Sequence, residues 1–139
     1  TSQRIFGKWT AAGDQRSYSL LTGAADRFTF QITNLGTFAD IDQVADTVDY
    51  DTGEWYFIVG RFDPSAAIYI DVNGRNTSTV AGIPASIFNS TSGLEIGSRD
   101  GGTAELYTGY VSCAFLCATY LSDAIVSSLF QQTRAAFGV

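Results

Sequence analysis

The stretch EWYFIVGRFDPSAAIYIDVNG, residues 54–74, indicates two neighbouring antiparallel strands. Residues 54–62 are apolar on both faces, which is typical of a strand covered on both sides, and we expect the central strand of a sheet here. Asp-Pro-Ser at 63–65 turns the chain, and residues 67–72 form the returning strand. Asn-Gly at 73–74 then predicts a tight hairpin, because both central positions of a type I′ turn need positive φ.

Strand patterns extend outward from this hairpin in both directions. In DRFTFQITN, residues 26–34, Phe28, Phe30 and Ile32 alternate with polar residues. This alternation predicts a half-buried strand with its three polar residues in water, and residues 4–34 as a whole predict a three-stranded meander. Further strands are expected at residues 43–49, 75–80, 94–98 and 105–119, the last of them long and bulged.

A short helix is expected near the C-terminus. The Ser122 hydroxyl is placed to cap the first turn, and Asp123 is favoured there by the helix dipole. Ile125, Leu129 and Phe130 give this helix one apolar side. Since the chain has 139 residues and neither a repeat nor a linker, we expect a single all-β domain over residues 1–139.

Composition and charge exclude several classes of function. The net charge of −6 and the single lysine among eight basic residues argue against nucleic acid as a partner, because affinity for phosphates depends on Lys and Arg. No apolar run approaches the roughly 18 residues that span a bilayer, so we expect no membrane insertion. The chain begins at Thr1 without a basic and apolar leader, and we expect it to be a mature or excised piece of a longer protein.

The two cysteines are predicted to be buried apolar thiols. In the expected strand YVSCAFLCATY, Cys113 and Cys117 would lie about 13 Å apart, which is too far for a disulfide. A zinc site is not expected from two thiols in a chain without histidine. Pairing with a cysteine of another chain stays open as the alternative.

Four segments, read in order, carry a resemblance to a known family. They are IFGKW with YSLL (5–9 and 18–21), GEWYFIVGRFD with IYIDVNG (53–63 and 68–74), LEIGS (94–98), and YTGYVSCAFLCATYLSDAIVSSLF (107–130). Their order and spacing resemble the laminin G-like, or concanavalin A-like lectin/glucanase, superfamily over nearly the whole chain. The resemblance implies a jelly-roll β-sandwich of two antiparallel sheets. It also implies a binding role, since related domains are widely used to bind glycans or extracellular proteins.

The sequence departs from the family pattern at two places. Ser112 and Cys113 stand where the family often has acidic residues, so any role of those acids does not carry over. Family members usually have a strand before the IFGKW element, and this chain has none. The domain is therefore expected to lack its first strand. Either missing preceding residues or another segment of this chain fills that place, or a strand of another chain does so in a larger assembly.

Catalysis is not expected. Jelly-roll glucanases display carboxylates as E-x-D-x-E along one strand, and this pattern is absent. Glu54, Glu95 and Glu105 are each isolated, and without histidine no catalytic triad forms. We therefore expect a protein that is not an enzyme.

The candidate binding residues combine aromatic rings with planar polar groups, which together recognise sugars. They are Tyr50, Tyr69, Tyr107, Arg99 and Asp100. No cofactor is required. Calcium at Asp49 and Asp51 is the alternative to two solvated turn carboxylates, since this loop lacks a third acid and the closing Glu of an EF-hand.

These observations favour a non-catalytic recognition module that is extracellular or displayed on the surface of a cell or virion. Its expected partner is a glycan or an extracellular protein, which makes carbohydrate binding and adhesion the predicted function. The alternative is a structural assembly protein, such as a virion decoration or fibre component or a surface filament component. In that role, sheet edges and apolar strands would contact other protein chains.

Overall fold

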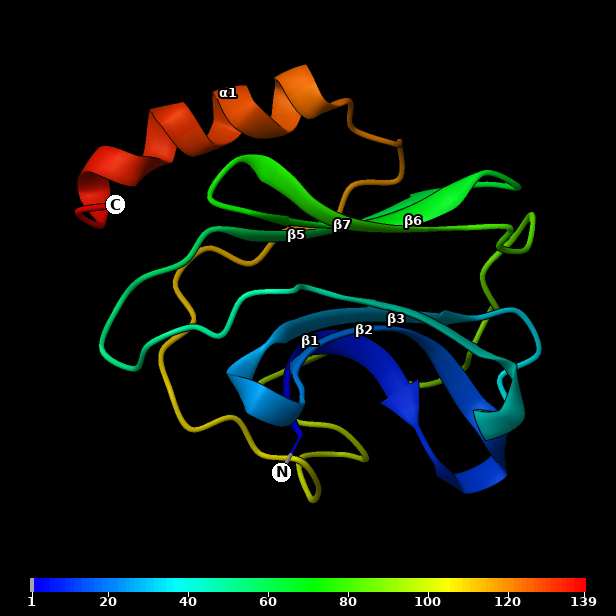
Figure 1. Cartoon of the computed structure of the whole chain (residues 1–139). Helices are drawn as coiled ribbons and strands as arrows, with labels where there is room; N and C mark the ends of the chain where they lie inside the picture. Colours follow the sequence, from blue (N-terminus) through cyan, green and yellow to red (C-terminus); the bar gives the residue numbers. More distant parts are fainter. Residues whose placement is uncertain (1) are drawn as a thin grey trace.

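Two antiparallel sheets lie face to face, and one helix covers the outer side of the smaller sheet (Figure 1). The computed structural model describes residues 2–139. The strand orders are β4-β3-β2-β1-β8 and β5-β6-β7. The elements are β1 (Gln3–Thr10), β2 (Gln15–Thr22), β3 (Phe28–Thr33), β4 (Ile41–Ala45), β5 (Ile58–Asp63), β6 (Ala67–Val72), β7 (Arg75–Ala81), β8 (Glu95–Ile96) and α1 (Asp123–Thr133). Single 3-10 turns lie at Ala12–Asp14, Ala24–Asp26, Phe38–Asp40 and Arg134–Ala136. The predicted all-β sandwich with one short C-terminal helix is confirmed.

The three-stranded meander at the start of the chain is confirmed by β1, β2 and β3. Phe28, Phe30 and Ile32 are buried and belong to the core between the sheets. The expectation that the alternate residues lie in water is wrong for Thr29, which is also buried. The fourth strand, expected at 43–49, is β4, Ile41–Ala45, which begins two residues earlier and ends four residues earlier than predicted.

The prediction of a central strand at residues 54–62 is wrong. β5 begins only at Ile58 and, among residues 2–139, pairs with β6 alone, so it is an edge strand of the second sheet. Trp55 lies before the strand, is 38% exposed and packs against Phe137 with ring centroids 5.1 Å apart. Trp55 and Phe57 therefore contact the C-terminal part of the chain, whereas Tyr56 packs on Phe28, and none of the three extends the strand.

The long strand predicted at residues 105–119 is also wrong, because residues 106–121 have no regular structure. The two ends of this segment are held by different sheets. The Arg4 amide of β1 donates to the Glu105 carbonyl at 2.8 Å, and Arg61 of β5 donates to the Leu121 carbonyl at 2.9 Å. The segment therefore crosses from one sheet to the other and does not follow an edge.

Cys113 and Cys117 lie on this crossing segment and are exposed, so the prediction of buried thiols is wrong for this arrangement. Their burial depended on the strand that the segment does not form. Both thiols are free.

The outer edge of β1 is covered by another part of this chain. β8 pairs with β1 at Phe6↔Ile96 and Gly7↔Glu95, and the Gly97 amide donates to the Ile5 carbonyl at 2.9 Å. A short strand from later in the sequence thus lies at the edge that the sequence left open.

The C-terminal helix begins at Asp123 as predicted, but two details differ. The Ser122 side chain makes no capping hydrogen bond, and its carbonyl accepts the amides of Ile125 and Val126 instead. Val126 and Phe130 are the buried residues, whereas Ile125 is 47% exposed. No helix within residues 2–139 has both the length and the apolar character that a bilayer crossing requires.

A buried ion pair joins the second sheet to the start of α1. The Arg61 guanidinium donates twice to the Asp71 carboxylate, at 2.7 and 2.8 Å, with both side chains almost fully buried. It also contacts Asp123 at 2.8 Å and the Tyr120 hydroxyl at 2.9 Å. Burial alone would lower the pKa of Arg61, but the bonds to Asp71 and Asp123 raise it above its ordinary value. The guanidinium is therefore charged and anchors the chain just before α1.

Removing one partner of the Arg61–Asp71 pair tests how much the pair contributes to the free energy of unfolding. Asp71→Asn removes the buried counter-charge of Arg61 and leaves only the exposed Asp123, and we expect it to lower the free energy of unfolding by about 3–5 kcal/mol. Asp123→Asn is the matched control: its side chain is 79% exposed, and we expect a loss below about 1 kcal/mol. Urea unfolding followed by circular dichroism measures both, and equal losses would contradict the assignment.

Gly7 provides a second test, of the pairing of β1 with β2. A Cβ atom at Gly7 would lie 2.6 Å from the Tyr18 carbonyl oxygen and 2.9 Å from the Ser19 Cα, and these backbone atoms have no room to move. Gly7→Ala should therefore destabilise the fold by about 1–3 kcal/mol in urea unfolding. A Cβ at Gly93 meets nothing within 4 Å, so Gly93→Ala should leave stability nearly unchanged. A tolerated Gly7→Ala would mean that the two strands do not pair in this register.

Candidate functional site

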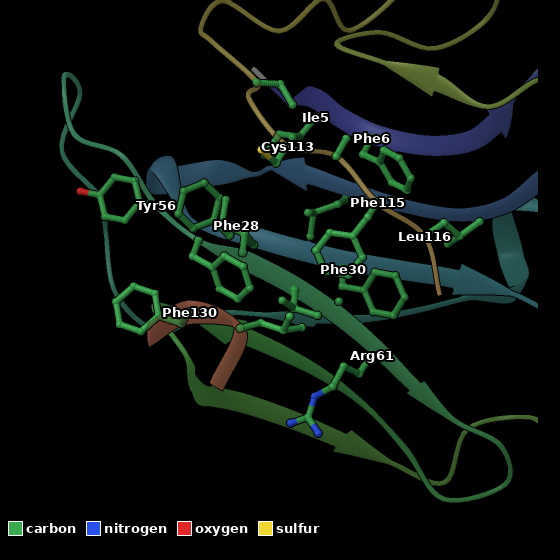
Figure 2. A pocket seen from close by; sticks show the side chains of 18 of the residues that line it. Ile5, Phe6, Phe28, Phe30, Tyr56, Arg61, Cys113, Phe115, Leu116 and Phe130 are labelled. Atoms are coloured by element: carbon green, nitrogen blue, oxygen red, sulfur yellow. The ribbon is translucent and has the colours of Figure 1, made fainter. Parts of the chain in front are cut away.

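A cavity of about 770 Å³ lies between the two sheets (Figure 2). Phe6, Phe28 and Phe30 of the first sheet line it, and Phe115 and Leu116 of the crossing segment lie over it. Its volume falls within the range of small-molecule sites. Because its lining is mostly aromatic and aliphatic, this cavity offers few of the hydrogen-bonding groups that a sugar needs.

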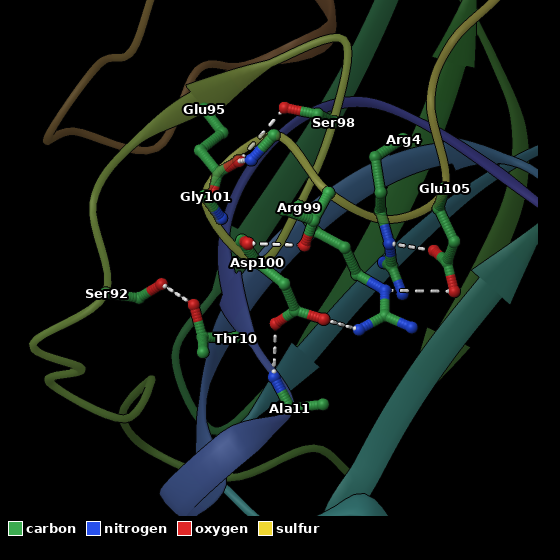
Figure 3. Close-up of polar contacts among 12 residues, drawn as sticks. Arg4, Thr10, Ala11, Ser92, Glu95, Ser98, Arg99, Asp100, Gly101 and Glu105 are labelled. Carbon is green, nitrogen blue, oxygen red and sulfur yellow. Dashed lines mark hydrogen bonds and ion pairs between the residues drawn. The ribbon is translucent and has the colours of Figure 1, made fainter.

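A polar network on the loop after β8 forms the second candidate site (Figure 3). The Asp100 carboxylate accepts the Ala11 amide at 2.7 Å and pairs with the Arg99 guanidinium. Arg4 Nε donates to the Glu105 carboxylate at 2.6 Å. Arg99 Nε lies 3.0 Å from the same carboxylate, close enough for an ion pair but outside hydrogen-bond geometry. The predicted residues Arg99 and Asp100 are thus brought together, and the network joins the loop to β1.

Glu95 organises the tip of the same loop. Its carboxylate accepts the Gly101 amide at 3.0 Å, the Gly102 amide at 2.9 Å and the Ser98 hydroxyl at 3.0 Å. Desolvation alone would raise the pKa of Glu95, but these hydrogen bonds favour the charged form and lower the pKa below its ordinary value. The ionised carboxylate therefore holds the glycine-rich turn in one conformation.

The backbone of this loop adopts conformations that residues with side chains rarely adopt. Asp100 and Glu105 have φ of 56° and 48°, and Gly101 and Gly102 follow Asp100 with φ of 71° and 81°. A non-glycine residue in the left-handed region costs free energy and persists where its surroundings enforce it. Here the carboxylates of both strained residues are held by arginines, which specifies the loop shape.

The three predicted tyrosines do not lie together. Tyr107 belongs to the same hairpin as Arg99, since its amide donates to the Gly97 carbonyl at 2.8 Å. Tyr50 packs on Phe28 with centroids 4.6 Å apart, and its hydroxyl bonds to Asp46.

Tyr69 lies elsewhere, in the second sheet. The Arg61 guanidinium stands 4.6 Å from the centre of its ring. The structure therefore joins Arg99 and Asp100 in one network, whereas the Tyr107 ring packs against the core and lines the cavity between the sheets. Tyr50 and Tyr69 lie apart from that network.

The two calcium candidates have little coordination support. The Asp49 carboxylate pairs with Arg27 at 2.7 Å, and Asp51 is exposed. Within residues 2–139 no three acidic, cysteine or histidine side chains gather as a metal-binding group. Calcium at these positions stays a prediction.

Sequence reasoning missed the role of Glu95, Glu105 and Arg4. In the sequence the two glutamates are candidates only for catalytic acids, and each is isolated there. The role of Glu95 could have been predicted. If the chain turns back at Gly101-Gly102, the carboxylate six residues before Gly101 can reach the amides of that turn. The pairing of Arg4 with Glu105 had no such signal, since 101 positions separate the two residues.

Glu95 gives a prediction about pH. Since its folded-state pKa is lowered, its contribution to stability is present above the ordinary glutamate pKa and is lost as the pH falls through the folded value. In NMR spectra the Gly101 and Gly102 amide shifts should titrate together, with a midpoint below that ordinary value. Glu95→Gln should abolish this titration, and Glu54→Gln, at an exposed position, should leave it unchanged. Titration that persists in Glu95→Gln would contradict the assignment.

Comparison with known proteins agrees with this architecture. Residues 1–127 match the laminin G-type family described as the concanavalin A-like lectin/glucanases superfamily. No curated protein matches the chain. A similar solved structure is that of residues 221–444 of an S-layer domain-containing protein from Clostridium thermocellum, with a TM-score of 0.50 and 15% identity. The alignment covers 93% of this chain but 63% of that one, so this chain spans less than two thirds of its length.

The family match confirms the resemblance seen in the sequence. It runs through every strand of both sheets and into α1. The chain belongs to the concanavalin A-like lectin/glucanases superfamily.

Proposed function

We propose that this chain is a non-catalytic recognition module that binds glycans through the loop of residues 97–107. Arg99 and Asp100 supply planar polar groups, which can hydrogen-bond to sugar hydroxyls. The rings of Tyr50, Tyr69 and Tyr107 are not part of the proposed site, because they pack elsewhere, Tyr107 against the core.

The observation that carries the proposal is the enforced shape of the loop. Two strained residues, Asp100 and Glu105, are each held by arginine, and Glu95 fixes the glycine turn between them. Preorganised polar groups bind more tightly, because less conformational entropy is lost on binding. The tip at residues 101–103 is exposed, so a ligand has access to it.

A surface location is part of the proposal. Membership in a superfamily that includes lectins supports it, and the solved domain of similar fold comes from an S-layer domain-containing protein. The proposed setting is the surface of a cell or particle, with a glycan or an extracellular protein as the partner.

A glycan array with variants of the loop tests the proposal. We expect saturable binding to at least one glycan, and a loss of about tenfold or more in affinity in Asp100→Ala, since this change removes both the carboxylate and its bond to the Ala11 amide just after β1. Asp51→Ala is the matched control at an exposed aspartate outside the loop and should bind as the wild type does. Circular dichroism of both variants verifies that the sandwich is intact.

Three outcomes would contradict the proposal. Glycan binding that is equal in Asp100→Ala and the wild type would place the site elsewhere. No binding together with stable oligomers in light scattering would favour the alternative of a structural assembly protein. Release of products in a hydrolysis screen on β-glucans would show that the module is catalytic.

A further inference from the structure

A small polar pocket lies between the β6–β7 hairpin and α1, on the outer side of the second sheet (Figure 1). Its volume is about 380 Å³, and Gly74 and Phe130 form part of its lining. A Cβ atom at Gly74 would lie 2.8 Å from the Phe130 side chain, so the hairpin and the helix are in direct contact here. The pocket is therefore bounded by two packed elements, and its volume suits one small molecule.

Two arginines without a counter-charge line this pocket. They are Arg75 of β7 and Arg134 of the 3-10 turn that follows α1. Every other arginine of the chain contacts a carboxylate. Within residues 2–139, Arg75 and Arg134 contact none, and no acidic residue is part of the pocket lining. Two like charges that share one pocket repel each other, so a bound anion is stabilised there.

The helix adds further polar groups to the same pocket. Ser127, Gln131 and Arg134 are spaced four and seven residues apart, which places them on one face of α1 and its continuation, and all three line the pocket. On the neighbouring face, the Gln132 amide donates to the Ser128 hydroxyl at 3.2 Å. The side chains of Ser127 and Gln131, by contrast, form no hydrogen bond within the described residues 2–139. Their donors and acceptors are therefore available to a ligand.

The helix dipole accounts for only part of this arrangement. A positive charge is favoured near the C-terminal end of a helix, which explains the position of Arg134. This explanation does not extend to Arg75, because Arg75 lies in β7. The same dipole disfavours an anion, but it amounts to about half a negative charge against the two full positive charges of the arginines. The electrostatics of the pocket therefore favour an anionic ligand.

We propose that this pocket binds a small hydroxylated carboxylate, of the size of one acidic monosaccharide such as glucuronate. A planar guanidinium matches a carboxylate through two parallel hydrogen bonds. The Ser127 hydroxyl and the Gln131 amide can each donate and accept, which suits the hydroxyl groups of such a ligand. The net charge of −6 repels polyanions, so the ligand is a single small anion.

This site is separate from the proposed glycan loop. The pocket lies beside the second sheet, whereas the loop of residues 97–107 is joined to the first sheet by the bond from the Ala11 amide to Asp100. Figure 1 shows α1 on the far side of the sandwich from β1. The inference therefore does not rest on the proposed function, and either can fail without the other.

NMR titration of the isotope-labelled, unmodified protein with sodium glucuronate at constant ionic strength tests the proposal. The amides of Gly74, Arg75, Ser127 and Gln131 should shift together and saturate with one dissociation constant, of about 1 mM. Glucose has the same ring without the carboxylate and should shift none of these amides. No saturable shift with glucuronate would overturn the proposal, as would an equal response to glucose.

Variants of the two arginines identify the groups that bind the carboxylate. Arg75→Ala and Arg134→Ala should each lower the affinity for glucuronate about tenfold or more, because each removes a charge-assisted interaction. Arg27→Ala is the matched control, since it removes the same charge at an exposed arginine outside the pocket, and it should bind as the wild type does. Wild-type affinity in Arg75→Ala would overturn the proposal. Circular dichroism verifies that all three variants are folded.

Two further measurements test the ligand class and the place of binding. Sodium sulfate and sodium phosphate, titrated at neutral pH, should bind more weakly than glucuronate, because neither has carbon-bound hydroxyl groups for Ser127 and Gln131. Tighter binding of either salt at the same amides would overturn the assigned ligand class. Asp100→Ala should bind glucuronate as the wild type does. Loss of glucuronate binding in that variant would place the acid in the loop of residues 97–107 and overturn the pocket assignment.

Discussion

Contact between the inner faces of the two sheets is the interaction on which the rest of the structure depends. Ile32 of β3 and Ile68 and Ile70 of β6 are fully buried in one cluster between the sheets. Each such side chain contributes about 1.5–3 kcal/mol when it leaves water. The loop network and α1 both lie on outer faces, so their positions follow from the packing of this central layer.

Two buried arginines connect this core to the functional elements. Arg4, on the outer face of the first sheet, holds Glu105 at the start of the crossing segment, and Arg61, on the outer face of the second, holds Leu121 at its end. Each guanidinium has an acidic partner, which offsets the cost of burying its charge. The proposed glycan loop and the crossing segment are thus tied to the sandwich by buried arginines, whereas the sheets are held together by apolar contact.

The sequence predicted those elements whose signals are local. Alternation at Phe28, Phe30 and Ile32 identified β3, and the Asn73-Gly74 turn identified the β6–β7 hairpin. The prediction that β5 is a central strand was wrong. Trp55 packs on Phe137, which lies 82 positions later in the chain, and not on a second layer covering β5. No local pattern in the sequence reveals that contact. In the site, Arg99 and Asp100 are neighbours in sequence and share one network. The positions of the Tyr50, Tyr69 and Tyr107 rings could not be predicted, since only tertiary packing decides what they contact.

Native-state hydrogen exchange tests the central claim most directly, since the slowest amides of a protein report its global unfolding. If the layer between the sheets holds the molecule together, the amides of Ile32, Ile68 and Ile70 should exchange slowest and with one common free energy. Slower exchange in α1 or in the loop of residues 97–107 than at these three isoleucines would contradict the account.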